Sequence, residues 1–297
     1  MSRDGRHVAL ICSEEYAPHA GAMLASLVGQ HPDGSLTLHF VPGPGMSAQN
    51  LERLGSIADR AGQQLHVHHI PPELTAGLPV LGRIGEIGWY RMLLGALLPE
   101  LDRILYLDVD AVVTDSLSPL FEVDLGDRVA VAIENAYLPQ RRADFARLGL
   151  DPADGYINTG VLLLNLERLR NGAAEAMFDR GHRDKALIEM AEQDVINMEF
   201  GDQILRVHPR WNCQNALFLF REGAEEVFGR SVVEEAVQNP AVIHFEGPGS
   251  CKPWHYLCDH PLRHLYLDHL ASTPWKTPPI EGRTAKNMLK RMLGRTG

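Results

Sequence analysis

The chain has 297 residues, of which 45% are hydrophobic and 22% charged, so it holds ample apolar material for the core of a globular protein. Its formal net charge of −10 argues against a body that binds nucleic acid through broad phosphate contacts. No apolar run of about 18 residues or more occurs, and the apolar stretch near the N-terminus is too short for a signal peptide, so we expect a cytoplasmic protein.

The first part of the chain alternates between strand and helix patterns. β-rich apolar runs and segments with apolar side chains at helical spacing follow one another over residues 7–12, 20–28, 36–41, 47–62 and 65–70. Ser47 stands where an N-cap of the second helical segment is expected. Strand–helix–strand order of this kind predicts a parallel sheet with helices on both faces.

The remaining segments continue the alternation. Helical patterns are predicted at 89–101 and over most of 167–200, and strands at 103–115, 128–134, 159–166, 203–208 and 241–247. A Pro- and Gly-rich piece at 274–282 then separates a short tail from the body. We expect one α/β domain over 1–270, followed by a linker and tail over 271–297.

Two carboxylates, Asp108 and Asp110, interrupt the apolar run at 103–113. On one strand they would lie side by side on the same face, because side chains at i and i+2 point the same way. A buried carboxylate without a partner is very costly, and a divalent cation such as Mg²⁺ or Mn²⁺ would relieve the repulsion of the pair. Such an ion keeps open positions for substrate phosphates. The alternative is a solvated strand end at which Asp110 starts a turn.

Two classes of enzyme use an apolar strand that ends in DxD. In haloacid dehalogenase-like phosphatases the first aspartate, here Asp108, is the nucleophile. That motif usually continues Gly-Thr-Leu and lies near the N-terminus, whereas here Ala111-Val112-Val113 follows and three predicted strands precede it. In nucleotide-sugar glycosyltransferases the motif binds a metal and the diphosphate of the donor.

Five stretches together resemble glycosyltransferase family 8, the retaining enzymes that include bacterial lipopolysaccharide galactosyl- and glucosyltransferases and glycogenin. The central stretch is RILYLDVDAVVTDSLSPLF at 103–121. The others, in order and with matching spacing, are WYRMLLGALLPELDR at 89–103, GYINTGVLLLNLERLR at 155–170, EQDVIN at 192–197 and HFEGPGSCKPWH at 244–255. The similarity extends over about residues 7–260.

The resemblance implies a single Rossmann-like, nucleotide-sugar-binding α/β domain of the GT-A type, with a mostly parallel central sheet flanked by helices. It also implies Mn²⁺ (or Mg²⁺) held by Asp108, Asp110 and His244. A histidine within an apolar strand is more often a core residue, but the Gly-rich loop and Lys252 that follow His244 favour a ligand. Lys252 matches the family lysine that contacts the diphosphate, where it would offset charge on the leaving group.

The resemblance also implies a set of donor-binding residues: Ser13, Tyr16, Arg91, Asp108, Asn158, Gly160, Asp194, Gly247 and Lys252. Gln193 falls under the anomeric carbon, and Glu192 replaces what is often an aspartate. One departure from the family lies in ALICSEEY, where the acidic residue that often contacts uracil falls on Ser13 and an asparagine on Glu15. No G-x-G-x-x-G follows this strand, which argues against a dinucleotide cofactor.

Three further features do not depend on the family resemblance. The four cysteines have no CxxC spacing and are expected to be reduced thiols: Cys12, Cys213, Cys251 and Cys258. His66 and His68 alternate on one strand, which indicates a solvated face more than a metal site. The segment 284–295 has an apolar stripe surrounded by basic residues, which suggests docking to an anionic membrane or, alternatively, packing of a last helix on the body.

These observations predict a metal-dependent retaining transferase that moves a hexose, galactose or glucose, from a UDP-sugar to a hydroxyl of a glycan or lipopolysaccharide-type acceptor. The linkage would be α, formed by front-face attack with Gln193 and Glu192 lining the reaction face and Lys252 stabilising the diphosphate. Two alternatives remain open at this point. One is a phosphatase with Asp108 as nucleophile, and the other is a degenerate protein that binds a sugar nucleotide without turnover.

Overall fold

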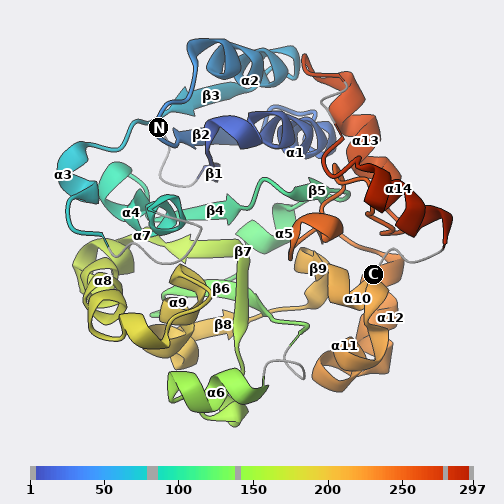
Figure 1. The fold of residues 1–297 in the computed structure, drawn as a ribbon. Coiled ribbons are helices and arrows are strands. Elements are labelled where there is room, and N and C mark those ends of the chain that lie inside the picture. The colour runs from blue at the N-terminus through green and yellow to red at the C-terminus, as the bar shows by residue number, and fades with distance from the viewer. Residues whose placement is uncertain (1–4, 79–85, 138–141, 277–279, 294–297) are drawn as a thin grey trace.

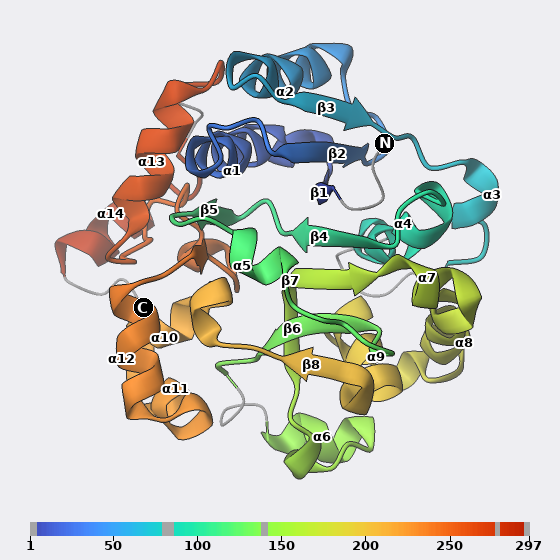
Figure 2. The same ribbon diagram turned by 180° about the vertical axis from the view of Figure 1, so that it is seen from behind.

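The computed structural model describes residues 5–78, 86–137, 142–276 and 280–293. A seven-stranded sheet with the order β3-β2-β1-β4-β7-β6-β8 runs through the molecule, and helices cover both of its faces (Figures 1 and 2). Its strands are β1 (Arg6–Cys12), β2 (Leu36–Pro42), β3 (Gln64–Val67), β4 (Arg103–Leu107), β6 (Ala130–Glu134), β7 (Ile157–Asn165) and β8 (Ile204–Arg206).

The sheet is mostly parallel, as predicted. β1 pairs in parallel with β2 and β4, β2 with β3, and β6 with β8. The exception is β7, which is antiparallel to both of its neighbours, β4 and β6. The near-continuous apolar runs of β1 and β7 fit strands that are buried on both faces.

Successive residues of β1 divide between two hydrophobic cores, because side chains alternate across a strand. Val8 and Leu10 pack in the core under α1 (Ala17–Gln30) and α2 (Ala48–Arg60). Ala9 and Ile11 pack in the core on the opposite face. The Ser47 hydroxyl accepts a hydrogen bond from the Asn50 N–H, which confirms the predicted cap of α2.

The other helices follow the sheet in the order of the chain. They are α3 (Pro72–Thr75), α4 (Tyr90–Leu97), α5 (Ser118–Phe121), α6 (Arg142–Leu148), α7 (Leu166–Arg168), α8 (Ala174–Arg183), α9 (Glu192–Phe200), α10 (Asn215–Leu219), α11 (Arg221–Phe228), α12 (Arg230–Gln238), α13 (Arg263–Ser272) and α14 (Ala285–Met292). Among the described residues, none of these helices has the length and apolar character that a bilayer crossing requires.

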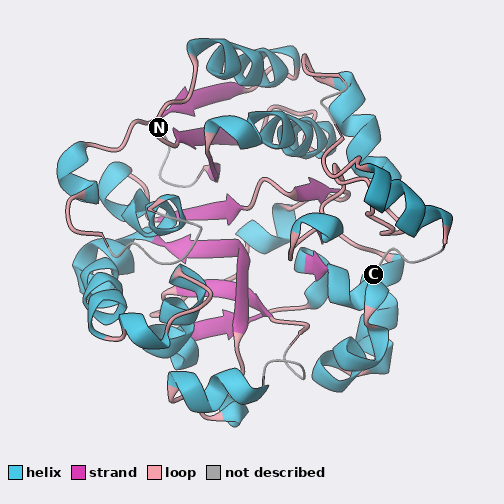
Figure 3. Ribbon diagram, in the orientation of Figure 1, coloured by secondary structure: helices cyan, strands magenta, loops and turns pink. Residues whose placement is uncertain are grey.

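The prediction of one strand over 103–115 was wrong. β4 ends at Leu107, and the chain leaves the large sheet through a turn that contains Asp108 and Asp110. It continues as β5 (Ala111–Val113) in a separate sheet with β10 (Val242–His244) and β9 (Cys213–Gln214), which Figure 3 shows apart from the large sheet. Val109 is buried in the turn, so apolar residues continue from one strand into the next. The sequence pattern therefore did not reveal the change of sheet.

The C-terminal part of the described chain returns to the N-terminal half. α13 packs along α1, and the Trp275 indole N–H donates to Asn50 Oδ1 on α2 at 3.2 Å. The expected division of the chain at residue 270 therefore falls inside α13. α14 follows with no buried residue.

His66 and His68 do not lie on a simple solvated face, contrary to expectation. A His68 ring nitrogen lies 2.9 Å from one of His39, and the other nitrogen of His39 lies 2.9 Å from His7. These three rings form a hydrogen-bonded row across β1, β2 and the end of β3, and His66 stacks beside His39 at 5.7 Å between ring centroids. Within the described residues, no metal-binding group of three or more side chains forms here.

Candidate active site

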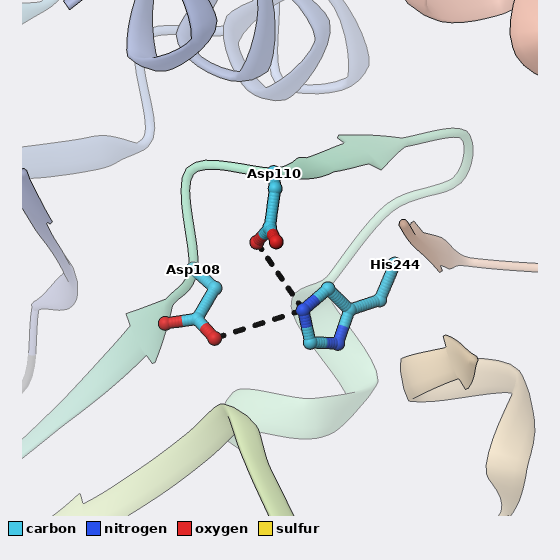
Figure 4. A group of neighbouring side chains, drawn as sticks. All are labelled: Asp108, Asp110 and His244. Carbon is cyan, nitrogen blue, oxygen red and sulfur yellow. Dashed lines mark ion pairs between the residues drawn. The ribbon is translucent and has the colours of Figure 1, made fainter. Parts of the chain in front are cut away.

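The turn between β4 and β5 brings two carboxylates against a histidine from the far end of the sequence. His244 Nε2 lies 3.2 Å from Asp110 Oδ1 and 3.6 Å from Asp108 Oδ2 (Figure 4). One ligand atom from each of the three residues lies within 4.8 Å of the others. The pairing of β5 with β10 places Ala111 opposite His244, and this register holds the histidine beside the turn.

The charges in this cluster are strongly coupled. Burial opposes ionisation of Asp110, but Lys252 and His244 outweigh that effect and lower the pKa of its carboxyl group. Burial likewise opposes protonation of His244, but the carboxylates of Asp110 and Asp108 raise its pKa. Lys252 Nζ donates a hydrogen bond to Asp110 Oδ2. The negative charge of Asp110 therefore lies beside the side chains of Lys252 and His244.

The donor set fits a divalent cation. Two carboxylates and one imidazole suit Mn²⁺, and Mg²⁺ is held by fewer protein ligands with waters or phosphates in the remaining positions. The side chain of His244 is buried, whereas those of Asp108 and Asp110 keep 26% and 14% of their surface exposed, so the cluster opens on the carboxylate side. A ligand that arrives from that side can complete the coordination.

The buried side chain of Arg91, on α4, contacts Asp108. Its Nη1 donates to the Thr159 carbonyl at 2.8 Å, and its Nη2 lies 3.4 Å from Asp108 Oδ1 and 3.2 Å from Glu192 Oε1. The guanidinium also lies over the ring of Tyr106, 4.3 Å from the centroid. Arg91 thus connects the metal cluster with the start of α9.

Tyr106 is a supporting residue that the sequence did not indicate. Its hydroxyl donates to Asp108 Oδ1 at 2.5 Å, while the other carboxylate oxygen, Oδ2, faces His244. Burial, reinforced by the Asp108 carboxylate, raises the pKa of Tyr106, so the hydroxyl stays a donor. The spacing of Tyr106 and Asp108 could have indicated this contact, because residues i and i+2 of an extended chain share a face.

Glu192 and Gln193 begin α9 and point to the same region. Burial raises the pKa of Glu192 although Arg91 opposes this, and its Oε2 is buried with no hydrogen-bond partner among the residues that the structure describes. Gln193 Oε1 accepts from the Thr159 N–H at 3.1 Å, and Nε2 donates to the Tyr156 hydroxyl at 3.3 Å. These contacts hold both side chains close to β7 and Arg91.

Asp194, the next residue, lies differently from the prediction that it binds the donor. It is fully buried, and its carboxylate accepts from the Tyr156 hydroxyl and from the N–H groups of Glu189 and Met190. These bonds enclose the turn at Ala191, which has φ 48°. Asp194 therefore supports the segment that presents Glu192 and Gln193.

Gly160 and Asn158 lie next to His244. A Cβ on Gly160 would lie 2.1 Å from His244 Cε1, so only glycine leaves room for the imidazole. Asn158 Oδ1 accepts from the Gly160 N–H at 2.9 Å and from Asn212 Nδ2 at 2.8 Å. The resemblance assigned both residues to the sugar pocket; in the structure Gly160 packs against His244, and Asn158 hydrogen-bonds Gly160 and Asn212. Asn212 was not predicted at all.

The loop after His244 carries Gly247 and Lys252. Gly247 has φ 94°, a conformation that L side chains rarely adopt. The loop then brings Lys252 back to Asp110, with Nζ 5.9 Å from the centroid of Trp254. Tyr16 contacts the same Trp254 edge-on, at 5.8 Å between centroids. Tyr16 and Lys252 thus both lie near one aromatic ring.

The turn after β1 contains the departure from the family pattern. Ser13 is half-buried and Glu15 exposed. Glu14 Oε2 accepts from the Ser47 N–H at 2.8 Å, which lowers the pKa of Glu14 and directs this carboxylate to the start of α2. Glu14 therefore binds the N-terminus of α2, and Glu15 is exposed to solvent.

A model of glycosyl transferase family 8 matches residues 7–258, most of the chain. The chain belongs to glycosyl transferase family 8. The protein is therefore a glycosyltransferase, and membership rejects the phosphatase alternative with Asp108 as nucleophile.

Relatives and solved structures agree with this family 8 assignment. General stress protein A of Bacillus subtilis (strain 168) is 26% identical over 277 residues, which cover 91% of this chain and 95% of that protein. The lipopolysaccharide 1,3-galactosyltransferase of Salmonella typhimurium is 24% identical, over 86% of this chain and 74% of its own. A crystal structure of the galactosyltransferase LgtC with donor and acceptor sugar analogs matches with a TM-score of 0.79 at 25% identity, covering 93% of this chain and 99% of that one. The predicted GT-A-type fold is thereby confirmed.

Proposed function

We propose that this family 8 enzyme transfers a hexose, galactose or glucose, from a UDP-sugar to a hydroxyl acceptor in a metal-dependent reaction. The observation that carries the proposal is the convergence of Asp108, Asp110 and His244 from two sheets, with Lys252 and Arg91 beside them. Two anionic ligands with cationic side chains on both sides suit a site for a metal–diphosphate complex.

Asp108, Asp110 and His244 Nε2 would hold the metal, Mn²⁺ or Mg²⁺. When bound, the ion supplies positive charge for the diphosphate of the donor. In this state Asp110 no longer needs Lys252 as its counter-ion, so the ammonium group is free to contact the diphosphate and to stabilise the charge that builds on it as the bond to the sugar breaks. Tyr16 and Gly247, which flank the Lys252 loop, would line the nucleotide side of the donor.

The sugar would lie against Glu192 and Gln193. Glu192 Oε2 is a buried acceptor without a protein partner among the described residues, which suits a sugar hydroxyl. LgtC, at a TM-score of 0.80, has an active-site variant in which a glutamine is replaced by glutamate, and we assign the corresponding place to Gln193. Retention and an α-linkage follow from the family resemblance, with front-face attack on the anomeric carbon.

The acceptor that we propose is a hydroxyl of a glycan or of lipopolysaccharide. Support comes from the relatives, which include lipopolysaccharide 1,2-glucosyltransferases of Escherichia coli, one of them 23% identical over 92% of this chain. The base of the donor would be read near Ser13, whose hydroxyl can donate to or accept from a uracil edge.

We further propose that α14 binds anionic lipid at the inner face of the cytoplasmic membrane. Leu289 and Met292 are exposed on this helix, and the basic residues Lys286, Lys290 and Arg291 surround them. On a molecule of net charge −10, a local basic and apolar helix is complementary to anionic lipid. We expect Leu289→Asp with Met292→Asp to abolish sedimentation with phosphatidylglycerol vesicles. The control Leu187→Asp, also at an exposed leucine, should sediment normally; equal sedimentation of both variants contradicts the proposal.

A thermal-shift screen over nucleoside diphosphates and UDP-sugars, with and without Mn²⁺, tests the function. We expect stabilisation by UDP and a UDP-hexose only when Mn²⁺ is present, and slow metal-dependent hydrolysis of the matching donor. No stabilisation by any nucleotide would overturn the proposal. Binding without hydrolysis or transfer would instead favour the degenerate sugar-nucleotide-binding alternative.

A further inference from the structure

The Nδ1 side of His244 faces a chain of buried amides. His244 Nδ1 lies 2.9 Å from Asn212 Oδ1, Asn212 Nδ2 lies 2.8 Å from Asn158 Oδ1, and that oxygen also receives the Gly160 N–H at 2.9 Å. Asn212 is fully buried, and His244 and Asn158 are nearly so. Water therefore cannot replace any bond in this chain without opening the core.

The direction of every bond in the chain follows from its last member. The backbone N–H of Gly160 is a donor, so the atom of Asn158 that faces it is the oxygen. Because that oxygen can only accept, the atom of Asn212 that faces it is the NH₂ group, which turns the Asn212 oxygen to the imidazole. The Asn212 oxygen in turn requires a proton on His244 Nδ1.

We infer that Asn212 is a positioning residue for the metal site, which keeps Nδ1 of His244 protonated and its Nε2 directed at Asp108 and Asp110. The ring would then need no rotation to bind a metal through Nε2. Hydrogen bonding of the second ring nitrogen commonly fixes the tautomer of a ligating histidine. The close packing of Gly160 against the ring also limits rotation of the imidazole.

This inference rests on the proposed function for the presence of a metal, but its first test needs no metal. In metal-free, ¹⁵N-histidine-labelled protein we expect a slowly exchanging Nδ1–H signal, assigned to His244 by its loss in His244→Gln. The signal should disappear in Asn212→Ala, which removes the oxygen acceptor at Nδ1. Absence of the signal from the wild type, or its persistence in Asn212→Ala, would overturn the inference.

The second test is the affinity for Mn²⁺ itself, measured by the loss of the free-ion electron paramagnetic resonance signal. We expect Asn212→Ala to weaken Mn²⁺ binding by about 10–100-fold, the range usual for loss of such a support. Asn50→Ala, on α2, is the matched control. Asn50 Oδ1 also accepts a hydrogen bond from a ring N–H, that of Trp275. The control should bind Mn²⁺ as the wild type does. Equal affinity of Asn212→Ala and the wild type would overturn the inference, whereas a wild type that binds no Mn²⁺ would overturn the proposed metal site.

Discussion

Lys252 and the metal ion that we propose would compete for the same carboxylate, that of Asp110. In the structure Lys252 Nζ donates to Asp110 Oδ2, and its side chain is largely buried with it. Under the proposed function, a cation that binds Asp110 would release this lysine toward the diphosphate. The lysine would then oppose metal binding before the donor arrives and assist departure of the nucleotide afterwards.

The substitution Lys252→Met separates these two effects. We expect Mn²⁺ affinity without nucleotide to be equal to or tighter than that of the wild type, because a competing charge is removed. We also expect kcat for transfer to fall by about 10²–10³, the effect of losing one electrostatic stabiliser. Metal titration and steady-state kinetics check this, and weakened metal binding with unchanged kcat would contradict it.

Gly160 gives a second prediction at this scale. In Gly160→Ala the new methyl group would meet the His244 ring, so we expect at least tenfold weaker Mn²⁺ binding and a loss of about 1–3 kcal/mol in the free energy of unfolding from overpacking. The control is Gly55→Ala on α2, where a Cβ meets nothing within 4 Å. The control should stabilise by about 0.5–1 kcal/mol, as alanine does in a helix. Denaturant unfolding measures both, and equal effects would contradict this account.

At the scale of elements, the turn before α9 contains backbone strain. Ala191 has φ 48° and ψ −131°, a region that non-glycine residues avoid at a cost of about 1–3 kcal/mol. Asp194 holds this turn through the N–H groups of Glu189 and Met190. The strained turn aims Glu192 and Gln193 at Arg91 and Thr159.

We therefore expect Ala191→Gly to stabilise the protein by about 1 kcal/mol, because relief of strain exceeds the added entropy of the unfolded chain. Urea unfolding measures the change. Asp194→Asn is the companion variant, and it should destabilise the protein because it weakens acceptance of the two N–H groups. A destabilised Ala191→Gly variant would show that the turn is not strained.

The histidine row across β1 to β3 makes stability depend on pH. Burial, reinforced by the charges of His7 and His68, lowers the pKa of His39 from 6.5 to about 3. Below pH 6.5 the unfolded chain takes up a proton that the folded chain excludes, so the free energy of unfolding falls as the pH falls toward 3. This residue contributes a slope of about 1.4 kcal/mol per pH unit in that window.

His39→Gln, which can hydrogen-bond both neighbouring rings, should reduce that slope by about 1.4 kcal/mol per pH unit between pH 6 and 4.5. Above pH 7 the variant and the wild type should have the same pH dependence. Urea unfolding across this range provides the measurement. An unchanged slope in the variant would mean that His39 is protonated in the folded protein.

The strands and the three candidate metal ligands were predicted for different reasons. The strands are apolar runs, whereas Asp108 and Asp110 interrupt such a run and His244 was indicated by the family resemblance. The supporting residues escaped prediction for two reasons. Tyr106 is one of several residues in an apolar run, although it lies only two residues before Asp108. Asn212 lies in a short turn that meets His244 only after folding. The split of 103–113 between two sheets escaped for the same reason, since its pairing with β10 joins segments about 130 residues apart.

At the scale of the whole molecule, the site lies where the two sheets meet. The large sheet supplies Asp108 at the end of β4 and Gly160 within β7, and the small sheet supplies His244 at the end of β10. Phe245 donates its N–H to the Asp110 carbonyl at 2.9 Å, which joins the sheets at the metal cluster. Metal binding should therefore stabilise the junction of the sheets. α14 has no buried residue, so the hydrophobic cores do not depend on it.

Titration of UDP into the protein with and without Mn²⁺ by isothermal calorimetry, for wild type and Asp110→Asn, tests the central claim most directly. We predict that the wild type binds UDP with Mn²⁺ at least 100-fold more tightly than without it, a gain of about 2.7 kcal/mol. In Asp110→Asn, Mn²⁺ should add little to UDP binding. UDP binding that is equally tight in all four experiments would contradict a metal–diphosphate site at Asp108, Asp110 and His244.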